Sequence, residues 1–161
     1  MKTLLVLRHA KSSWNDSSLD DRERPLNARG RGDAPRVGDL LRGKGLTPDL
    51  ILTSDAVRAH ATAQAVSEAA GVAADIVVDP RLYLAGPQDI IAVLQTVADD
   101  NARIVLLVGH NPGLEELVAQ LTGVAEDLPT AALVKLTVPI ETWAELSLST
   151  GATLVDIWRP K

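Results

Sequence analysis

The sequence contains no cysteine and no phenylalanine, and its only aromatic side chains are Trp14, Tyr83, Trp143 and Trp158. The lack of cysteine excludes disulfide bonds, thiolate metal ligands and a cysteine nucleophile. The scarcity of aromatic residues leaves little material for a surface that stacks the bases of single-stranded nucleic acid. The core must therefore be built mainly from Leu, Val, Ile and Ala, and demanding chemistry falls to arginine, carboxylates and three histidines.

Long apolar stretches are also absent. The apolar run at the amino end covers residues 3–7 before Arg8 and His9 follow, which is too short for a secretory signal or a membrane span. We therefore expect a cytoplasmic protein that does not enter a membrane. A length of 161 residues is that of one domain, and 46% hydrophobic with 23% charged residues is typical of a chain that buries a core.

Charge is unevenly distributed along the chain. The net charge of −5 and the pI of about 5.1 give no reason to expect nucleic acid or anionic membranes as partners. Residues 1–60 nevertheless contain 11 of the 16 basic and 8 of the 21 acidic residues, so this part carries +3 and the rest −8. The arginines gathered near the amino end form either a solvated basic face or part of a site.

Short apolar runs alternate with longer segments of helical periodicity. Buried strands are expected at residues 3–7, 50–52, 76–78 and 104–108. Helices are expected at about 28–44, 56–70 and 87–99, and from residue 112 onward. This alternation predicts an α/β fold, a three-layer α/β/α sandwich with a mostly parallel sheet. Residues 133–138 and 153–158 indicate a terminal hairpin in which at least one strand is antiparallel to the rest.

Several helix ends carry recognisable signals. Asn27 is suited to cap the first helix, and Gly45 and Gly71 to end the first and second. The fourth helix has Asn111 as its expected N-cap and Pro112 at its first position.

Polar residues directly follow three of the expected parallel strands. Arg8 and His9 follow the first strand, residues 54–58 follow the second, and His110 follows the strand at 104–108. Ligands of open α/β sheets bind at the carboxyl ends of the strands, so these residues are expected to meet at one edge. A single histidine at a strand end is usually structural, but two accompanied by arginine favour a site. Arginine forks bind phosphoryl groups, and an imidazole can attack phosphorus and carry the group covalently.

Five sequence blocks resemble a known family. Residues 7–15, LRHAKSSWN, resemble the amino-terminal signature of the histidine phosphatase superfamily, whose usual form is Arg-His-Gly; here Ala10 replaces the glycine. The other four blocks are similar to its small SixA-type phosphohistidine phosphatase branch: RPLNARG at 24–30, SDAVRAHATA at 54–63, LY at 82–83 and GHNPG at 109–113. The resemblance implies a phosphoglycerate mutase-like fold and a single histidine phosphatase domain over residues 1–161.

The resemblance also implies roles for individual residues. His9 would be the nucleophile and become transiently phosphorylated. Arg8 and Arg58 would bind phosphate, Arg24 would close the pocket, and His110 would stabilise the transferring group.

Two further candidates come from the mutase and broad-phosphatase relatives. Asn15 matches a position that contacts phosphate in the mutases. Those mutases place a glutamate as general acid three residues before a tyrosine, but counting back from Tyr83 gives Pro80, so Asp79 is the nearest substitute. A weak general acid suits leaving groups that need little protonation, such as the imidazole of phosphohistidine.

The leading hypothesis is a phosphatase that removes phosphate from a phosphohistidine protein through phospho-His9, without metal or cofactor. Only about 25 residues separate the strands at 76–78 and 104–108, which leaves no room for the capping insertion of larger relatives and favours a protein substrate. The alternatives are a small-molecule phosphomonoesterase or mutase of the same superfamily, and a phosphate-binding module without turnover. A zinc hydrolase using His9, His60 and His110 is disfavoured, because His60 lies about 200° around the helix from Arg58.

Overall fold

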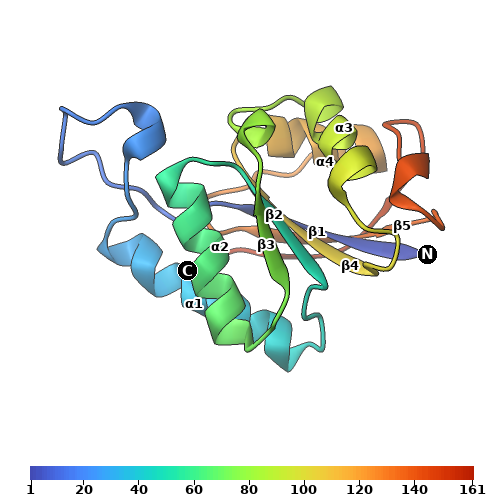
Figure 1. Cartoon of the computed structure of the whole chain (residues 1–161), viewed down its shortest axis with the longest axis horizontal. Helices are drawn as coiled ribbons and strands as arrows, with labels where there is room; N and C mark the ends of the chain where they lie inside the picture. The colour runs from blue at the N-terminus through green and yellow to red at the C-terminus, as the bar shows by residue number, and fades with distance from the viewer.

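The computed structural model describes all 161 residues and contains one six-stranded sheet, with the order β3-β2-β4-β1-β5-β6 (Figure 1). Its strands are β1 (Lys2–Arg8), β2 (Leu50–Thr53), β3 (Asp75–Val78), β4 (Ile104–Gly109), β5 (Leu133–Val138) and β6 (Thr153–Trp158). Its helices are α1 (Ala28–Gly43), α2 (Val57–Ala70), α3 (Pro87–Val97) and α4 (Gly113–Thr122). Short 3-10 helices occur at η1 (Asp21–Glu23), η2 (Pro80–Leu82) and η3 (Trp143–Glu145).

The sheet is mixed, as the sequence predicts. Strands β1, β4, β2 and β3 pair parallel with one another, whereas β5 pairs antiparallel with both β1 and β6. The antiparallel strand is therefore β5, near the carboxyl end.

Helices cover both faces of the sheet and bury its alternating side chains. In Figure 1, α1 and α2 lie below the sheet and α3 and α4 above it. Along β1, Leu5 and Leu7 join a buried cluster of 16 residues on the α1–α2 side, and Leu4 and Val6 join one of 26 residues on the other side. Each of these leucines is fully buried, which stabilises the fold by about 1.5–3 kcal/mol per side chain. None of the helices is long and apolar enough to cross a membrane.

Two of the predicted helix boundaries are confirmed by cap geometry. The Asn27 side chain accepts a 2.9 Å hydrogen bond from the Gly30 backbone N–H, as an N-cap should. Gly71 ends α2 in the left-handed conformation, with a φ of 66°.

The prediction that Asn111 caps the fourth helix is wrong. Helix α4 begins at Gly113, and Pro112 occupies the N-cap position. The Asn111 side chain instead donates an Nδ2 hydrogen to the carbonyl of Leu128 at 2.8 Å. Asn111 is therefore bonded to a residue far along the chain and does not cap the first turn of α4. A side chain at Gly113 would place its Cβ 1.9 Å from the carbonyl oxygen of Ala85, so glycine is required there. Helix α3 also ends two residues earlier than expected, at Val97.

Candidate active site

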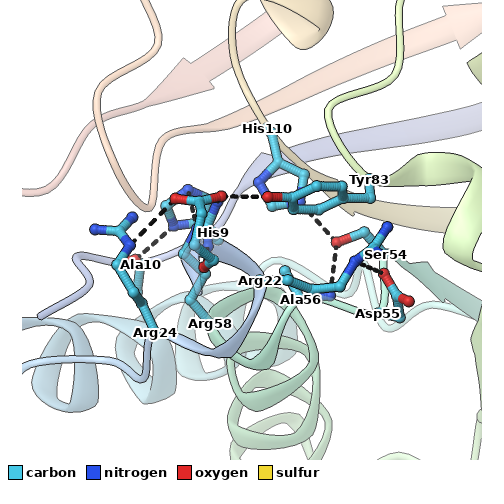
Figure 2. A network of polar contacts seen from close by, with 11 residues as sticks. His9, Ala10, Arg22, Arg24, Ser54, Asp55, Ala56, Arg58, Tyr83 and His110 are labelled. Atoms are coloured by element: carbon cyan, nitrogen blue, oxygen red, sulfur yellow. Dashed lines mark hydrogen bonds and ion pairs between the residues drawn. The ribbon is translucent and has the colours of Figure 1, made fainter. Parts of the chain in front are cut away.

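The parallel pairing of β1 with β4 brings His9 and His110 together. Arg8 is opposite Gly109 in the strand register, so the residues that follow them leave the sheet side by side. The two imidazole rings lie with their centroids 5.2 Å apart and their planes at 54°. Figure 2 shows His9 between Arg24 and His110, with Arg58 rising from α2 beneath it. The sheet edge predicted from the sequence therefore holds both histidines and the arginines.

These side chains line a pocket of about 300 Å³. The residues that line it are Arg8, His9, Lys11, Ser12, Trp14, Asp21, Arg24, Arg58, Leu84, His110, Asn111 and Thr130. Of the candidates from the sequence, both histidines and all three arginines are among them. The pocket thus combines two imidazoles, three guanidinium groups and one carboxylate.

His9 is held in the form that a nucleophile needs. Its Nδ1 lies 2.7 Å from the carbonyl oxygen of Ala10, so Nδ1 carries the ring proton and donates it there. Nε2 is therefore unprotonated, and its lone pair accepts a hydrogen bond from the Nε of Arg58 at 3.4 Å. Burial and the three nearby arginines lower the pKa of His9 to about 4, although the bond to Ala10 opposes this shift. At neutral pH the ring is therefore uncharged.

Ala10 replaces the glycine of the usual Arg-His-Gly motif without disturbing the site. It is fully buried in the cluster beside α2, and its backbone is not in the left-handed region. Its N–H donates to Thr62 Oγ1 at 3.0 Å, and Thr62 in turn donates to the carbonyl of Arg58. The position therefore does not require glycine in this chain.

His110 is held by Ser54 and Tyr83. Its Nε2 lies 2.7 Å from the Oγ of Ser54, which comes from the end of β2. The backbone N–H of Ala56 also donates to this oxygen at 3.4 Å, so the Ser54 hydroxyl links His110 to the start of α2. The Tyr83 ring packs edge-on at 5.4 Å between centroids. Burial and the charges of Arg58 and a protonated His9 lower the pKa of His110 to about 3.

Three buried nitrogen atoms in this region have no hydrogen-bond partner: Arg8 Nε, Arg24 Nη1 and His110 Nδ1. A buried polar group without a partner costs about 1–3 kcal/mol, so such groups mark places where a ligand atom completes the bonding. The other contacts of these arginines fix their positions. Arg8 Nη1 donates to Leu128 at 3.1 Å, and the Arg24 guanidinium lies 3.4 Å from the centroid of the exposed Trp14 ring. Donors fixed around a small pocket are what an oxyanion requires.

Comparison with known proteins identifies the family. Residues 4–83 match the model of the histidine phosphatase superfamily, branch 1. An uncharacterized chloroplastic protein of Arabidopsis thaliana is 30% identical over 158 residues, which cover 93% of this chain and 72% of the relative. The structure of a SixA protein from Agrobacterium tumefaciens is 30% identical, covers 99% of both chains and superposes with a TM-score of 0.79. The chain belongs to the histidine phosphatase superfamily, in its SixA-type branch.

The fold agrees with this assignment. The protein histidine phosphatase SixA complexed with tungstate has a TM-score of 0.80 over 96% of this chain and 95% of its own, at 22% identity. The family match together with the similarity to the SixA phosphatase structure supports a phosphatase, with the two strand-end histidines in its pocket.

One pocket residue of this histidine phosphatase, Asp21, was not among the candidates from the sequence. It begins η1 and supplies the only carboxylate among the pocket-lining residues. Its side chain accepts hydrogen bonds from Arg24, Arg58 and Tyr83. The one available signal was its position three residues before Arg24, which allows an ion pair over one helical turn.

Two candidates from the sequence lie outside the pocket. Asn15 is exposed in the loop after Trp14, where its backbone N–H donates to Ser13 Oγ at 3.1 Å. Asp79 is the N-cap of η2 and forms a 2.7 Å ion pair with Arg81. Hydrogen bonds from Arg81 lower the pKa of Asp79, which is the opposite of what a proton donor needs. The structure therefore gives neither residue a contact with the site.

His60 also lies apart from the pocket, in agreement with its expected direction on α2. No three His, Cys, Asp or Glu side chains lie close enough together to hold a metal ion.

Proposed function

We propose that this phosphatase hydrolyses phosphohistidine in a protein, with residues 1–161 acting as one histidine phosphatase domain. One observation carries the proposal: a neutral His9, unprotonated at Nε2, faces a pocket in which buried nitrogen atoms of Arg8, Arg24 and His110 have no partner. A phosphoryl group brings three oxygens that accept these bonds.

The reaction then follows in two steps. The Nε2 lone pair attacks phosphorus, the N–P bond of the substrate breaks, and the leaving imidazole keeps the electron pair and takes up a proton from solvent. Arg8, Arg24 and Arg58 balance the charge on the equatorial oxygens, and His110 donates through Nδ1. Water next attacks phospho-His9, which releases inorganic phosphate and restores the neutral ring.

The lack of a proton donor in the pocket favours phosphohistidine over sugar or glycerol phosphates. The pKa of Asp21 is lowered to about 2, chiefly by the hydrogen bond from Tyr83, so this carboxyl group is ionised at neutral pH. Asp79 is paired with Arg81 outside the pocket. An alkoxide leaving group needs a general acid, whereas the imidazole of phosphohistidine leaves with little help. This argues against the mutase and small-molecule phosphomonoesterase alternatives.

The deciding experiment compares wild-type protein with His9→Ala on a phosphohistidine protein. Wild type should release phosphate and accumulate acid-labile phosphate on His9, which peptide mass spectrometry locates. His9→Ala should do neither, while the matched control His60→Ala should behave like wild type. Equal turnover by His9→Ala would reject the covalent mechanism. Binding without phospho-His9 would favour the phosphate-binding module, and faster turnover of phosphoglycerate would favour the small-molecule alternative.

A further inference from the structure

The Asp21 side chain joins three groups that converge on the pocket. Its Oδ1 accepts from Arg24 Nε at 3.2 Å, and its Oδ2 accepts from Arg58 Nη2 at 2.9 Å. The Tyr83 hydroxyl donates to the same Oδ2, and Tyr83 packs against His110. Burial and the bond to Asp21 raise the pKa of Tyr83, so the hydroxyl keeps its proton and remains a donor. One carboxylate thus ties two arginines and a tyrosine together.

The contacts of Asp21 determine which edge of Arg58 is free. Arg58 Nη1 donates to the backbone carbonyl of Asp21 at 2.5 Å, while Nη2 donates to its carboxylate. The end of the guanidinium is therefore occupied by Asp21, and the Nε atom is left facing His9 Nε2 at 3.4 Å. The Nε–H of Arg58, which donates to His9 Nε2, thereby lies beside the place where phosphorus must approach the nucleophile.

Asp21 has a similar effect on Arg24. Its Oδ1 accepts the hydrogen bond from Arg24 Nε, whereas the buried Nη1 of Arg24 has no partner. Trp14 stacks on the guanidinium plane at 3.4 Å, so the plane cannot turn freely. Arg24 is only 6% exposed, whereas the Asp21 side chain is 43% exposed, so the carboxylate approaches both arginines from the solvent side.

The segment that carries Asp21 is itself anchored. Residue Asp20 closes a capping box with Glu23 around η1, and the Ser13 N–H donates to the carbonyl of Pro25 at 2.8 Å. Arg22 lies over the Tyr83 ring at 4.1 Å and pairs with Asp55 at 3.1 Å. Asp21 is therefore held from both sides and is not a loosely placed surface residue.

We propose that Asp21 is a positioning residue of the phosphatase reaction: it holds the Arg24 and Arg58 guanidinium groups so that their remaining donors face the phosphoryl group on His9. This inference rests on the phosphate-binding roles proposed above for the two arginines. Asp21 is not the missing proton donor, because it is ionised at neutral pH in this network.

The test uses Asp21→Asn, which keeps the shape of the side chain and removes its charge, and Asp39→Asn, at an exposed position of α1, as the control. We expect kcat on a phosphohistidine protein to fall about tenfold or more in Asp21→Asn, because small displacements of catalytic groups are costly. The inhibition constant of orthophosphate should stay the same or become tighter, since a negative charge has been removed next to the anion. Asp39→Asn should match wild type in both measurements. An increase of kcat in Asp21→Asn would show that the carboxylate competes with substrate and would overturn the proposal, as would an unchanged kcat.

A double-mutant cycle separates this inference from the proposed function. In an Arg58→Ala background, Asp21→Asn should lower kcat by a smaller factor than in wild type, because one of the two groups that it positions is gone. Full activity of Arg58→Ala itself would contradict the proposed role of Arg58. Loss of activity in Arg58→Ala together with an equal, independent loss on adding Asp21→Asn would reject only the positioning role.

Discussion

The imidazole rings of His9 and His110 lie 5.2 Å apart between centroids, and both are kept neutral by burial beside arginines. The first prediction concerns protonation of the free enzyme. We expect the His9 ring to titrate with a midpoint near 4, well below the usual value of about 6.5, when followed by NMR. The kcat/KM, corrected for substrate ionisation and non-enzymatic hydrolysis, should hold from pH 7 to about pH 5 and then decline. A His9 midpoint at or above 6 would contradict the neutral nucleophile.

The same shifts make stability depend on pH. Because the folded-state pKa values of His9 and His110 lie below the unfolded value, the unfolded chain binds more protons between about pH 3 and pH 6.5. Their contribution to the free energy of unfolding is thus complete above pH 6.5 and decreases as the pH falls through 4 towards 3. Urea unfolding of a His9→Asn, His110→Asn double variant should show a flatter pH dependence than wild type, and an unchanged slope would contradict these pKa shifts.

Ser54 should matter for both activity and stability. Ser54→Ala removes the hydroxyl that lies 2.7 Å from His110 Nε2 and leaves that buried nitrogen without a partner. We expect the free energy of unfolding to fall by about 1–3 kcal/mol and kcat to drop severalfold. In a His110→Ala background the same change should have a much smaller effect on kcat. Additive effects on kcat would mean that Ser54 does not act through His110.

Gly113 and Gly32 form a matched pair for a packing test. Gly113→Ala brings a Cβ to 1.9 Å from the Ala85 carbonyl oxygen, so the segment that carries Tyr83 and Leu84 must shift. It should destabilise the protein by about 1–3 kcal/mol and reduce kcat. Gly32, inside α1, has nothing within 4 Å of the added Cβ, so Gly32→Ala should stabilise by about 0.5–1 kcal/mol without changing kcat. Thermal unfolding would measure both, and a neutral Gly113→Ala would refute the close approach.

Trp14 should support Arg24 through the face of its ring. The guanidinium carbon lies 3.4 Å from the ring centroid, at an exposed position where such a contact contributes about 0.5–1 kcal/mol. Trp14→Ala should therefore raise the inhibition constant of orthophosphate two- to fivefold, and Trp14→Tyr should restore most of the affinity. An unchanged inhibition constant in Trp14→Ala would mean that the other contacts of Arg24 are enough to hold its guanidinium group in place.

The sequence predicted most of the fold because the relevant signals are local. The apolar runs at 133–138 and 153–158 have the bounds of β5 and β6, and Asn27 and Gly71 mark helix ends through their own backbone preferences. The sequence analysis places His9 and His110 at one edge of the sheet, but the pairing of β1 with β4, which makes them neighbours, comes from the structure. The prediction that Asn111 caps the fourth helix failed because its side chain donates a hydrogen bond to the carbonyl of Leu128, which lies far along the chain.

The roles of two carboxylates, Asp79 and Asp21, could not be predicted from the sequence. Asp79 follows β3 directly and was a reasonable substitute for a general acid, but Arg81 pairs with it outside the pocket. Asp21 stands in an acidic and basic stretch of ordinary surface character, and only the path of the loop back over α2 brings it to Arg58. Contacts between a loop and a distant helix depend on the whole packing arrangement, which no short pattern encodes.

The site draws on strands that lie together at the centre of the sheet but are far apart in the chain. A chain divided in the connection between α3 and β4 would leave Arg8, His9, Arg24 and Arg58 on one fragment and His110 on the other. Neither fragment alone holds a complete pocket, and the two can meet only by rebuilding the β1–β4 pairing. Release of phosphate would then serve as a direct readout of fragment reassembly.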